Sequence, residues 1–82
     1  MNEVKILFFA NLRDAVGARS IQMELPVETT IAELKDKLID THPGLSFFRN
    51  SIMAAINHEY VADDQHIPPE AEIAFFPPVS GG

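Results

Sequence analysis

The last two residues of the chain, Gly81 and Gly82, are the ones whose types and spacing best suit a chemical role. Glycine has no Cβ, so the backbone there can pass through a narrow channel and adopt any φ. Pro77 and Pro78 fix φ shortly before them and favour an extended course away from the domain. A second protein can activate a terminal carboxylate presented in this way as a mixed anhydride, which a nucleophile then attacks. The sequence therefore indicates that the Gly82 carboxylate is the working group.

The side chains offer few alternatives for chemistry. The chain has no cysteine, which excludes a disulfide framework, a thiolate zinc site, a cysteine nucleophile and a ferredoxin-type iron–sulfur cluster. His42, His58 and His66 match no metal-binding spacing. Asp63 and Asp64 supply too few oxygen ligands at set spacing for a metal ion. We therefore expect no bound metal, no bound cofactor and no self-contained active site.

Charge is unevenly distributed along the chain. The net charge is −6, and no lysine or arginine follows Arg49. An acidic C-terminal half argues against a nucleic-acid partner, whose phosphates need basic residues, and suits a basic protein partner. Simple solubility explains the charge equally well. No apolar run approaches a membrane span and no signal peptide is evident, so we expect a cytoplasmic protein without membrane contact.

The elements that must position the tail are predicted from local patterns. The apolar run 4–10 indicates a central strand buried on both faces, and residues 11–16 could form one helical turn. Alternation over 20–25 indicates a half-buried strand pairing back on the first. Thr30 and Glu33 form a capping box, which starts a helix over 31–41.

The second half of the chain predicts three further strands. These lie at 52–56, 59–61 and 72–76, after a turn at 45–50 anchored by Phe47 and Phe48. A single helix can cover only one face of one mixed sheet, and the two terminal strands should lie side by side in its middle. The expected fold is therefore an α+β β-grasp domain over residues 1–76, followed by an extended tail over 77–82.

Two phenylalanine pairs fall on the expected central strands. Phe8 and Phe9 point to opposite faces of the sheet, as do Phe75 and Phe76. Because one face has little cover, one phenylalanine of each pair could be exposed there as a partner-binding patch. Burial of these rings under the loops is equally open.

Several stretches together resemble a known family. Residues 74–82 read AFFPPVSGG, residues 55–61 read AINHEYV, residues 8–14 read FFANLRD, and residues 30–38 match a capped helix. Together they span nearly the whole chain and, in the same order along it, resemble the small subunit of molybdopterin synthase, which belongs to the sulfur-carrier group of ubiquitin-like proteins. One departure is the turn before the last strand, where the family usually has Gly-Asp-Glu. We expect a different turn geometry here because Ala71 tolerates a positive φ poorly.

The resemblance implies a mechanism. An E1-like adenylating enzyme would use ATP to adenylate Gly82, and a sulfur donor would convert the adenylate to a thiocarboxylate. The tail would then enter the large subunit of molybdopterin synthase, in a heterotetramer, and give its sulfur to a cyclic pterin precursor to build the molybdopterin dithiolene. The site residues that the resemblance assigns to partner contact are Phe9, Arg13, Phe76, Pro77, Pro78, Val79 and Ser80, with Gly81 and Gly82 entering the partner's site.

Three other functions share part of this pattern. A sulfur carrier of thiamin synthesis also ends in Gly-Gly, although its chains are usually shorter and do not have the FFPPVS stretch. A ubiquitin-like modifier would use the same activated tail but would end in an amide bond on a lysine. A plain interaction domain would have an inert tail.

Overall fold

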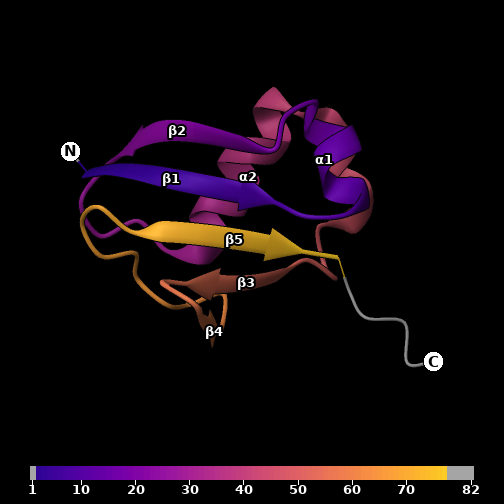
Figure 1. Cartoon of the computed structure of the whole chain (residues 1–82). Coiled ribbons are helices and arrows are strands. Elements are labelled where there is room, and N and C mark those ends of the chain that lie inside the picture. Colours follow the sequence, from indigo (N-terminus) through magenta and orange to yellow (C-terminus); the bar gives the residue numbers. More distant parts are fainter. Residues whose placement is uncertain (1, 78–82) are drawn as a thin grey trace.

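A computed structural model of the chain describes residues 2–77 (Figure 1). Its strands are β1 (Asn2–Phe8), β2 (Ser20–Leu25), β3 (Met53–Ile56), β4 (Glu59–Val61) and β5 (Glu72–Phe76). Its helices are α1 (Asn11–Val16), α2 (Ile31–Thr41) and the 3₁₀ helix η1 (Pro43–Phe48).

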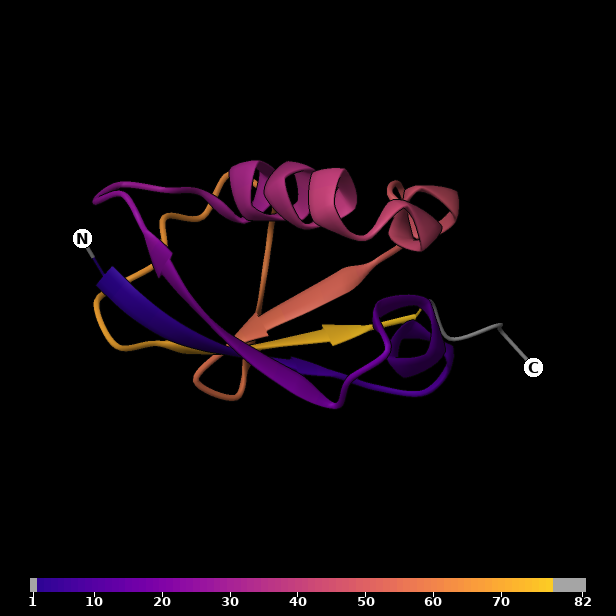
Figure 2. The same cartoon turned by 90° about the horizontal axis from the view of Figure 1, so that it is seen from above.

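The strands form one mixed sheet in the order β2-β1-β5-β3-β4. β1 and β5 are parallel neighbours in the middle, and the other neighbouring pairs are antiparallel. Helix α2 lies across one face of this sheet (Figure 2). The predicted α+β β-grasp arrangement, with its terminal strands side by side, is therefore confirmed.

Helix α2 begins and ends as its sequence predicts. The Thr30 hydroxyl accepts a hydrogen bond from the Glu33 backbone N–H at 3.2 Å, and the Glu33 carboxylate accepts one from the Thr30 N–H at 3.0 Å. These accepted bonds lower the pKa of Glu33 below its ordinary value. The buried face of the helix carries Ile31, Leu34 and Leu38. The capping box and a helical apolar stripe are thus enough to define this element.

The core lies between α2 and one face of the sheet. Its strand residues alternate, with Val4, Ile6 and Phe8 buried on β1. The prediction that this strand is buried on both faces is wrong, because, of the two residues between them, Lys5 is exposed and Leu7 is only half-buried. The strand also ends at Phe8 rather than at residue 10. One face of the sheet is left open, so a central strand here has only one buried face.

The segment after α2 differs from its prediction in two ways. It forms the 3₁₀ helix η1 rather than an irregular turn, and Phe48 packs against the core while Phe47 is 89% exposed. Phe47 therefore does not anchor this segment. Gly44 lies close to α1, because a Cβ added there would be 3.3 Å from the Ala15 carbonyl oxygen. The contact holds η1 beside α1.

A buried lysine joins α2 to two distant segments. Lys35 is 5% exposed, and its ammonium donates to the Ile52 carbonyl at 2.8 Å and to the Asp63 carboxylate at 2.6 Å. Arg49 lies 3.6 Å from the other Asp63 oxygen. The hydrogen bond from Lys35 holds the pKa of Asp63 below its ordinary value. These three side chains, Lys35, Arg49 and Asp63, form a polar brace that fixes the β4–β5 connection to the helix.

Two turns use non-glycine residues with positive φ. Asn57 and His58 have φ values of 48° and 75°, which fits the type I′ hairpin turn between β3 and β4. In the turn before β5 the positive φ falls on Glu70, at 57°, while Ala71 is buried at 1% exposure. Glu70, and not Ala71, therefore takes the left-handed position of that turn.

The polar brace predicts an acid-sensitive contribution to stability. Asp63→Asn should lower the free energy of unfolding at pH 7 by about 1–2 kcal/mol. The substitution replaces the carboxylate by a neutral amide, so the buried Lys35 ammonium loses the negative charge that accepts its hydrogen bond. The folded pKa of Asp63 is lowered, so its contribution is present above the unfolded value of about 3.9 and is lost as pH falls through the folded pKa.

Urea unfolding of both chains from pH 7 down to the acid limb checks this. The stability difference between wild type and Asp63→Asn should shrink as the pH falls below about 4. Asp64→Asn is the matched control, because Asp64 is exposed and takes no part in the brace. A difference that is unchanged at low pH would contradict the assigned role of the Asp63 charge.

The β3–β4 hairpin predicts a stabilising substitution. His58→Gly should raise the free energy of unfolding by roughly 0.5–1 kcal/mol, because Asn-Gly is the preferred pair of a type I′ turn and glycine adopts a positive φ without strain. Thermal unfolding of the two chains measures the change. His66→Gly is the control and should not stabilise, because His66 has no positive φ to relieve.

Candidate docking and transfer site

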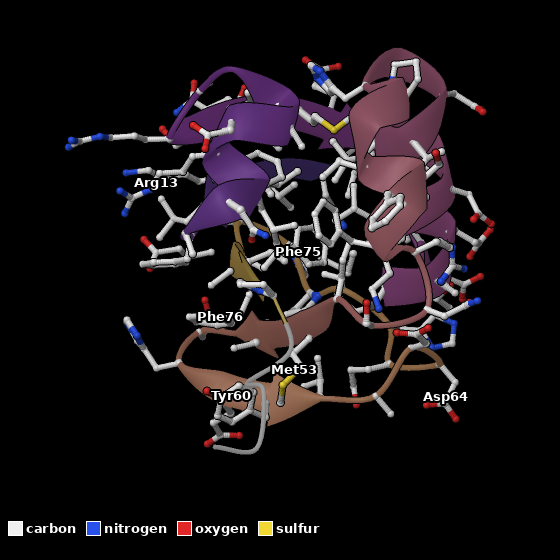
Figure 3. All side chains as sticks on the ribbon, turned by 90° about the vertical axis from the view of Figure 1, so that its right-hand side faces the viewer. Arg13, Met53, Tyr60, Asp64, Phe75 and Phe76 are labelled. Atoms are coloured by element: carbon white, nitrogen blue, oxygen red, sulfur yellow. The ribbon has the colours of Figure 1, made fainter. Side chains whose placement is uncertain are left out.

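The open face of the sheet carries an aromatic cluster at one end. The rings of Phe9 and Phe76 stack with their centroids 4.7 Å apart and their planes 12° apart. The Tyr60 ring lies 5.8 Å from that of Phe76, and Met53 is the register partner of Phe76 on β3. We call Phe9, Met53, Tyr60 and Phe76 the aromatic patch. Figure 3 shows three of these residues, Met53, Tyr60 and Phe76, on the end of the molecule where Arg13 also lies.

Each phenylalanine pair is divided between the two faces. Phe8 and Phe75 are buried in the core at 1% and 2% exposure, with their ring centroids 6.1 Å apart. Phe9 and Phe76 are only half-buried on the open face. The predicted division of each pair between opposite faces of the sheet is therefore confirmed, and the open-face member of each pair is half-buried.

The rest of the aromatic patch is more open to solvent. Tyr60 is 69% exposed and Met53 is 40% exposed. These neighbouring apolar and aromatic side chains on the open face form a candidate surface for binding another molecule. The flat rings and the thioether can contact a partner while losing little conformational entropy, because the rings already pack on one another.

Arg13 is held against the patch by two contacts. Its Nε–H donates to the Phe8 carbonyl at 3.0 Å, and its guanidinium carbon lies 5.7 Å from the centre of the Phe9 ring. A guanidinium over an aromatic face is attracted by the ring quadrupole. The guanidinium has four further N–H donors, and the residue is exposed, so it adds a fixed positive charge to the rim of the patch.

The chain leaves the sheet beside this patch. β5 ends at Phe76, and the half-buried Pro77 follows it. The predicted roles of Pro78, Val79, Ser80, Gly81 and Gly82 fall on residues outside the described part of the chain. The structure therefore brings together Phe9, Arg13, Phe76 and Pro77 and places them where the final residues begin.

Two members of the patch, Met53 and Tyr60, were not predicted. The sequence signal for these two residues is the period-2 alternation of the hairpin, in which Tyr60 lies opposite Ala55. This alternation places them beside Phe76 only when the register of β3 with β5 is also known, in which Met53 lies opposite Phe76. A single sequence does not contain that register directly.

No metal site is found within residues 2–77, because no three side chains of His, Asp or Glu there are grouped to hold an ion. Within the same residues, no helix has the length and apolar composition needed to cross a membrane.

A five-stranded mixed sheet with a helix across one face and an aromatic patch at the end of the last strand defines a ubiquitin-like domain of β-grasp fold. The chain belongs to the ThiS family, whose sequence profile matches residues 6–82. The match includes the Gly-Gly end of the sequence.

Individual relatives cover almost the whole chain. The molybdopterin synthase sulfur carrier subunit of Dictyostelium discoideum is 40% identical, over 99% of this chain and 98% of its own length. The human protein of the same name is 39% identical, over 98% and 94%. Among solved structures, the small archaeal modifier protein 1 of Methanosarcina acetivorans is 27% identical, with a TM-score of 0.82 over 100% of this chain and 98% of its own.

The division of the phenylalanines predicts opposite outcomes for adjacent positions. Phe75→Ala should lower the free energy of unfolding by about 3–5 kcal/mol, because it opens a cavity in the core. Phe76→Ala should cost only about 1 kcal/mol, because it removes a half-exposed stacking contact. Urea unfolding of both variants measures these values, and equal losses would show that Phe76 is a core residue rather than part of a docking surface.

Proposed function

We propose that this chain is the sulfur carrier subunit of a molybdopterin synthase. The observation that carries the proposal is its similarity, at 39–40% identity and over nearly the whole of both chains, to proteins of that name. The aromatic patch beside Pro77 supports it, because a carrier needs a docking surface close to the start of the segment that it delivers. The absence of cysteine also agrees with sulfur held on the terminus instead of on a thiol.

The chemistry of the proposal takes place on Gly82. A carboxylate oxygen attacks the α-phosphorus of ATP in an E1-like activating enzyme, and pyrophosphate leaves. With hydrosulfide as the simplest sulfur donor, sulfur then attacks the acyl carbon and AMP leaves with one of the original carboxylate oxygens. The product is a thiocarboxylate, which passes its sulfur to a cyclic pterin precursor in the large subunit. The chain acts as a co-substrate, and the catalytic groups belong to its partners.

The partners in this proposal are the large subunit, in a heterotetramer, and the activating enzyme with its sulfur donor, in the cytoplasm. The aromatic patch with Arg13 is the surface that we assign to both proteins. The acidic residues after Arg49 suit a basic partner surface, through long-range steering and local complementarity. Pro77, Pro78, Val79 and Ser80 would carry Gly81 and Gly82 from the patch into the partner's active site.

A second function is favoured by the solved structures. The neighbour with a TM-score of 0.82 is named a small archaeal modifier protein. A modifier uses the same adenylated carboxylate, but the nucleophile is a lysine amine of a target, and the product is an isopeptide instead of a thiocarboxylate. The two functions differ only in what attacks the acyl carbon, so mass analysis of the products distinguishes them.

Intact mass spectrometry tests the carrier function directly. The purified chain is incubated with an activating enzyme, ATP and a sulfur donor, and its mass is compared before and after. We expect a gain equal to the replacement of one oxygen by sulfur, mapped to the C-terminal peptide. Deletion of Gly82, or addition of one residue after it, should abolish the gain without changing the circular dichroism spectrum, because residue 82 follows the last strand.

The controls separate the outcomes. A known carrier treated with the same enzyme shows that the enzyme is competent. No mass gain in wild type beside a positive control would overturn the sulfur-carrier function, and isopeptide-linked adducts of the chain in its place would establish the modifier function. Unfolding of the chain that lacks Gly82 would show that the terminus has a structural role instead.

A further inference from the structure

Ala10 has an unusual backbone conformation at the edge of the aromatic patch. It joins β1 to α1 with φ of 54° and ψ of −135°. Contacts of the Cβ with the backbone make this region unfavourable for every residue except glycine. A residue held in such a conformation stays there only when its surroundings over-determine it, and strain of this kind gathers at functional sites.

Three hydrogen bonds between the residues before and after this turn hold Ala10 in its conformation. The Leu12 N–H donates to the Phe9 carbonyl at 3.2 Å, and the Arg13 N–H donates to the Ala10 carbonyl at 3.1 Å. The Arg13 side chain adds its bond to the Phe8 carbonyl at 3.0 Å. Leu12 is fully buried, so α1 cannot move away without exposing it. The turn is therefore locked from both its strand side and its helix side.

The conformation of Ala10 has a direct geometric consequence. The chain changes from strand to helix within two residues, Phe9 and Ala10, since β1 ends at Phe8 and α1 begins at Asn11. Phe9 stays close to β5, where its N–H donates to the Phe75 carbonyl at 3.2 Å and its ring stacks on Phe76. The first turn of α1 brings Arg13 back toward the strand, where its guanidinium lies over the Phe9 ring. An ordinary extended residue at position 10 would direct α1 away and separate these groups.

The other non-glycine residues with positive φ in residues 2–77 are of a different kind. They are Glu28, Asn57, His58 and Glu70. Asn57 and His58 form a standard hairpin turn, and Glu28 and Glu70 lie in connections outside the patch. Ala10 alone among the five directly follows a patch residue and carries an oxygen that accepts from Arg13.

We propose that Ala10 is a positioning residue for partner binding, and that its strained backbone fixes Phe9 and Arg13 in the arrangement that the partner contacts. This rests on the proposed function, in which the aromatic patch docks onto the large subunit. Glycine at position 10 would relieve the strain but would also allow other conformations, in which Phe9 and Arg13 could move independently.

Chemical synthesis of the chain with D-alanine at position 10 gives the sharpest test. The mirror image of Ala10's conformation is an ordinary extended conformation, so D-alanine adopts the observed one without strain. We expect the D-alanine chain to unfold at a higher temperature and to bind the purified large subunit as tightly as wild type. Ala10→Val, which cannot easily adopt a positive φ, should weaken that binding about tenfold or more.

Nuclear Overhauser contacts between the Phe9 and Phe76 rings provide a readout that a general loss of stability would not move. We expect them to be kept in the D-alanine chain and lost in Ala10→Val. Glu28→Val is the matched control, because Glu28 also has a positive φ of 72° but lies between β2 and α2. It should lose stability but keep both the ring contacts and wild-type affinity.

Two results would overturn the positioning role. One is wild-type affinity with intact ring contacts in folded Ala10→Val, and the other is weakened binding by the D-alanine chain. If Ala10→Val does not fold, Ala10→Gly provides the test. The proposal requires the Ala10→Gly chain to bind more weakly than the D-alanine chain, and equal affinities would refute the proposal. A wild-type chain that binds no large subunit would instead count against the proposed function, while the ring contacts would still decide whether Ala10 fixes this geometry.

Discussion

The parallel pairing of β1 with β5 is the constraint on which the rest of the structure depends. It places Ile6 beside Ile73 and Phe8 beside Phe75, and all four are buried. Bringing together strands from opposite ends of the chain has an entropic cost that grows only slowly with the length between them, and burial of large apolar side chains offsets it. Because the strands are parallel, both end at the same edge of the sheet. Phe9 and Phe76 therefore emerge side by side, at the point where the chain leaves the domain.

Elements defined by local signals were predictable from the sequence. Features that depend on which other elements pack over a given face were not. The capping box of Thr30 and Glu33 fixed the start of α2 because both partners lie within one turn. The first strand was expected to be buried on both faces because residues 4–10 are largely apolar. That run contains two apolar sets with different roles, one in the core and one, including Phe9, on the open face. Phe47 was misplaced because apolar type alone does not tell which side of a short 3₁₀ helix faces solvent.

The candidate site was predictable in part for the same reason. Alternation divides Phe8 from Phe9 and Phe75 from Phe76, so the central pair of the patch follows from strand geometry. Met53 and Tyr60 join them only through the register of β3 with β5 and β4, which is non-local. The conformation of Ala10 gives no sequence signal at all, because turns are recognised by Gly, Pro, Asn, Asp and Ser. The contact of Arg13 with the Phe8 carbonyl depends on that turn and was equally inaccessible.

The open face also explains how, under the proposed function, this domain takes part in a reaction whose catalytic groups belong to its partners. In that proposal the partners supply the groups that react with the terminal carboxylate, and the domain contributes binding and positioning. A patch of stacked rings with an arginine locked at its rim is already ordered before contact, so less entropy is lost when a partner binds. Under the proposed function the activating enzyme and the large subunit use the same patch, and they must therefore bind in turn. The binding must be reversible between the two, which a small patch on a rigid sheet provides better than a large interface.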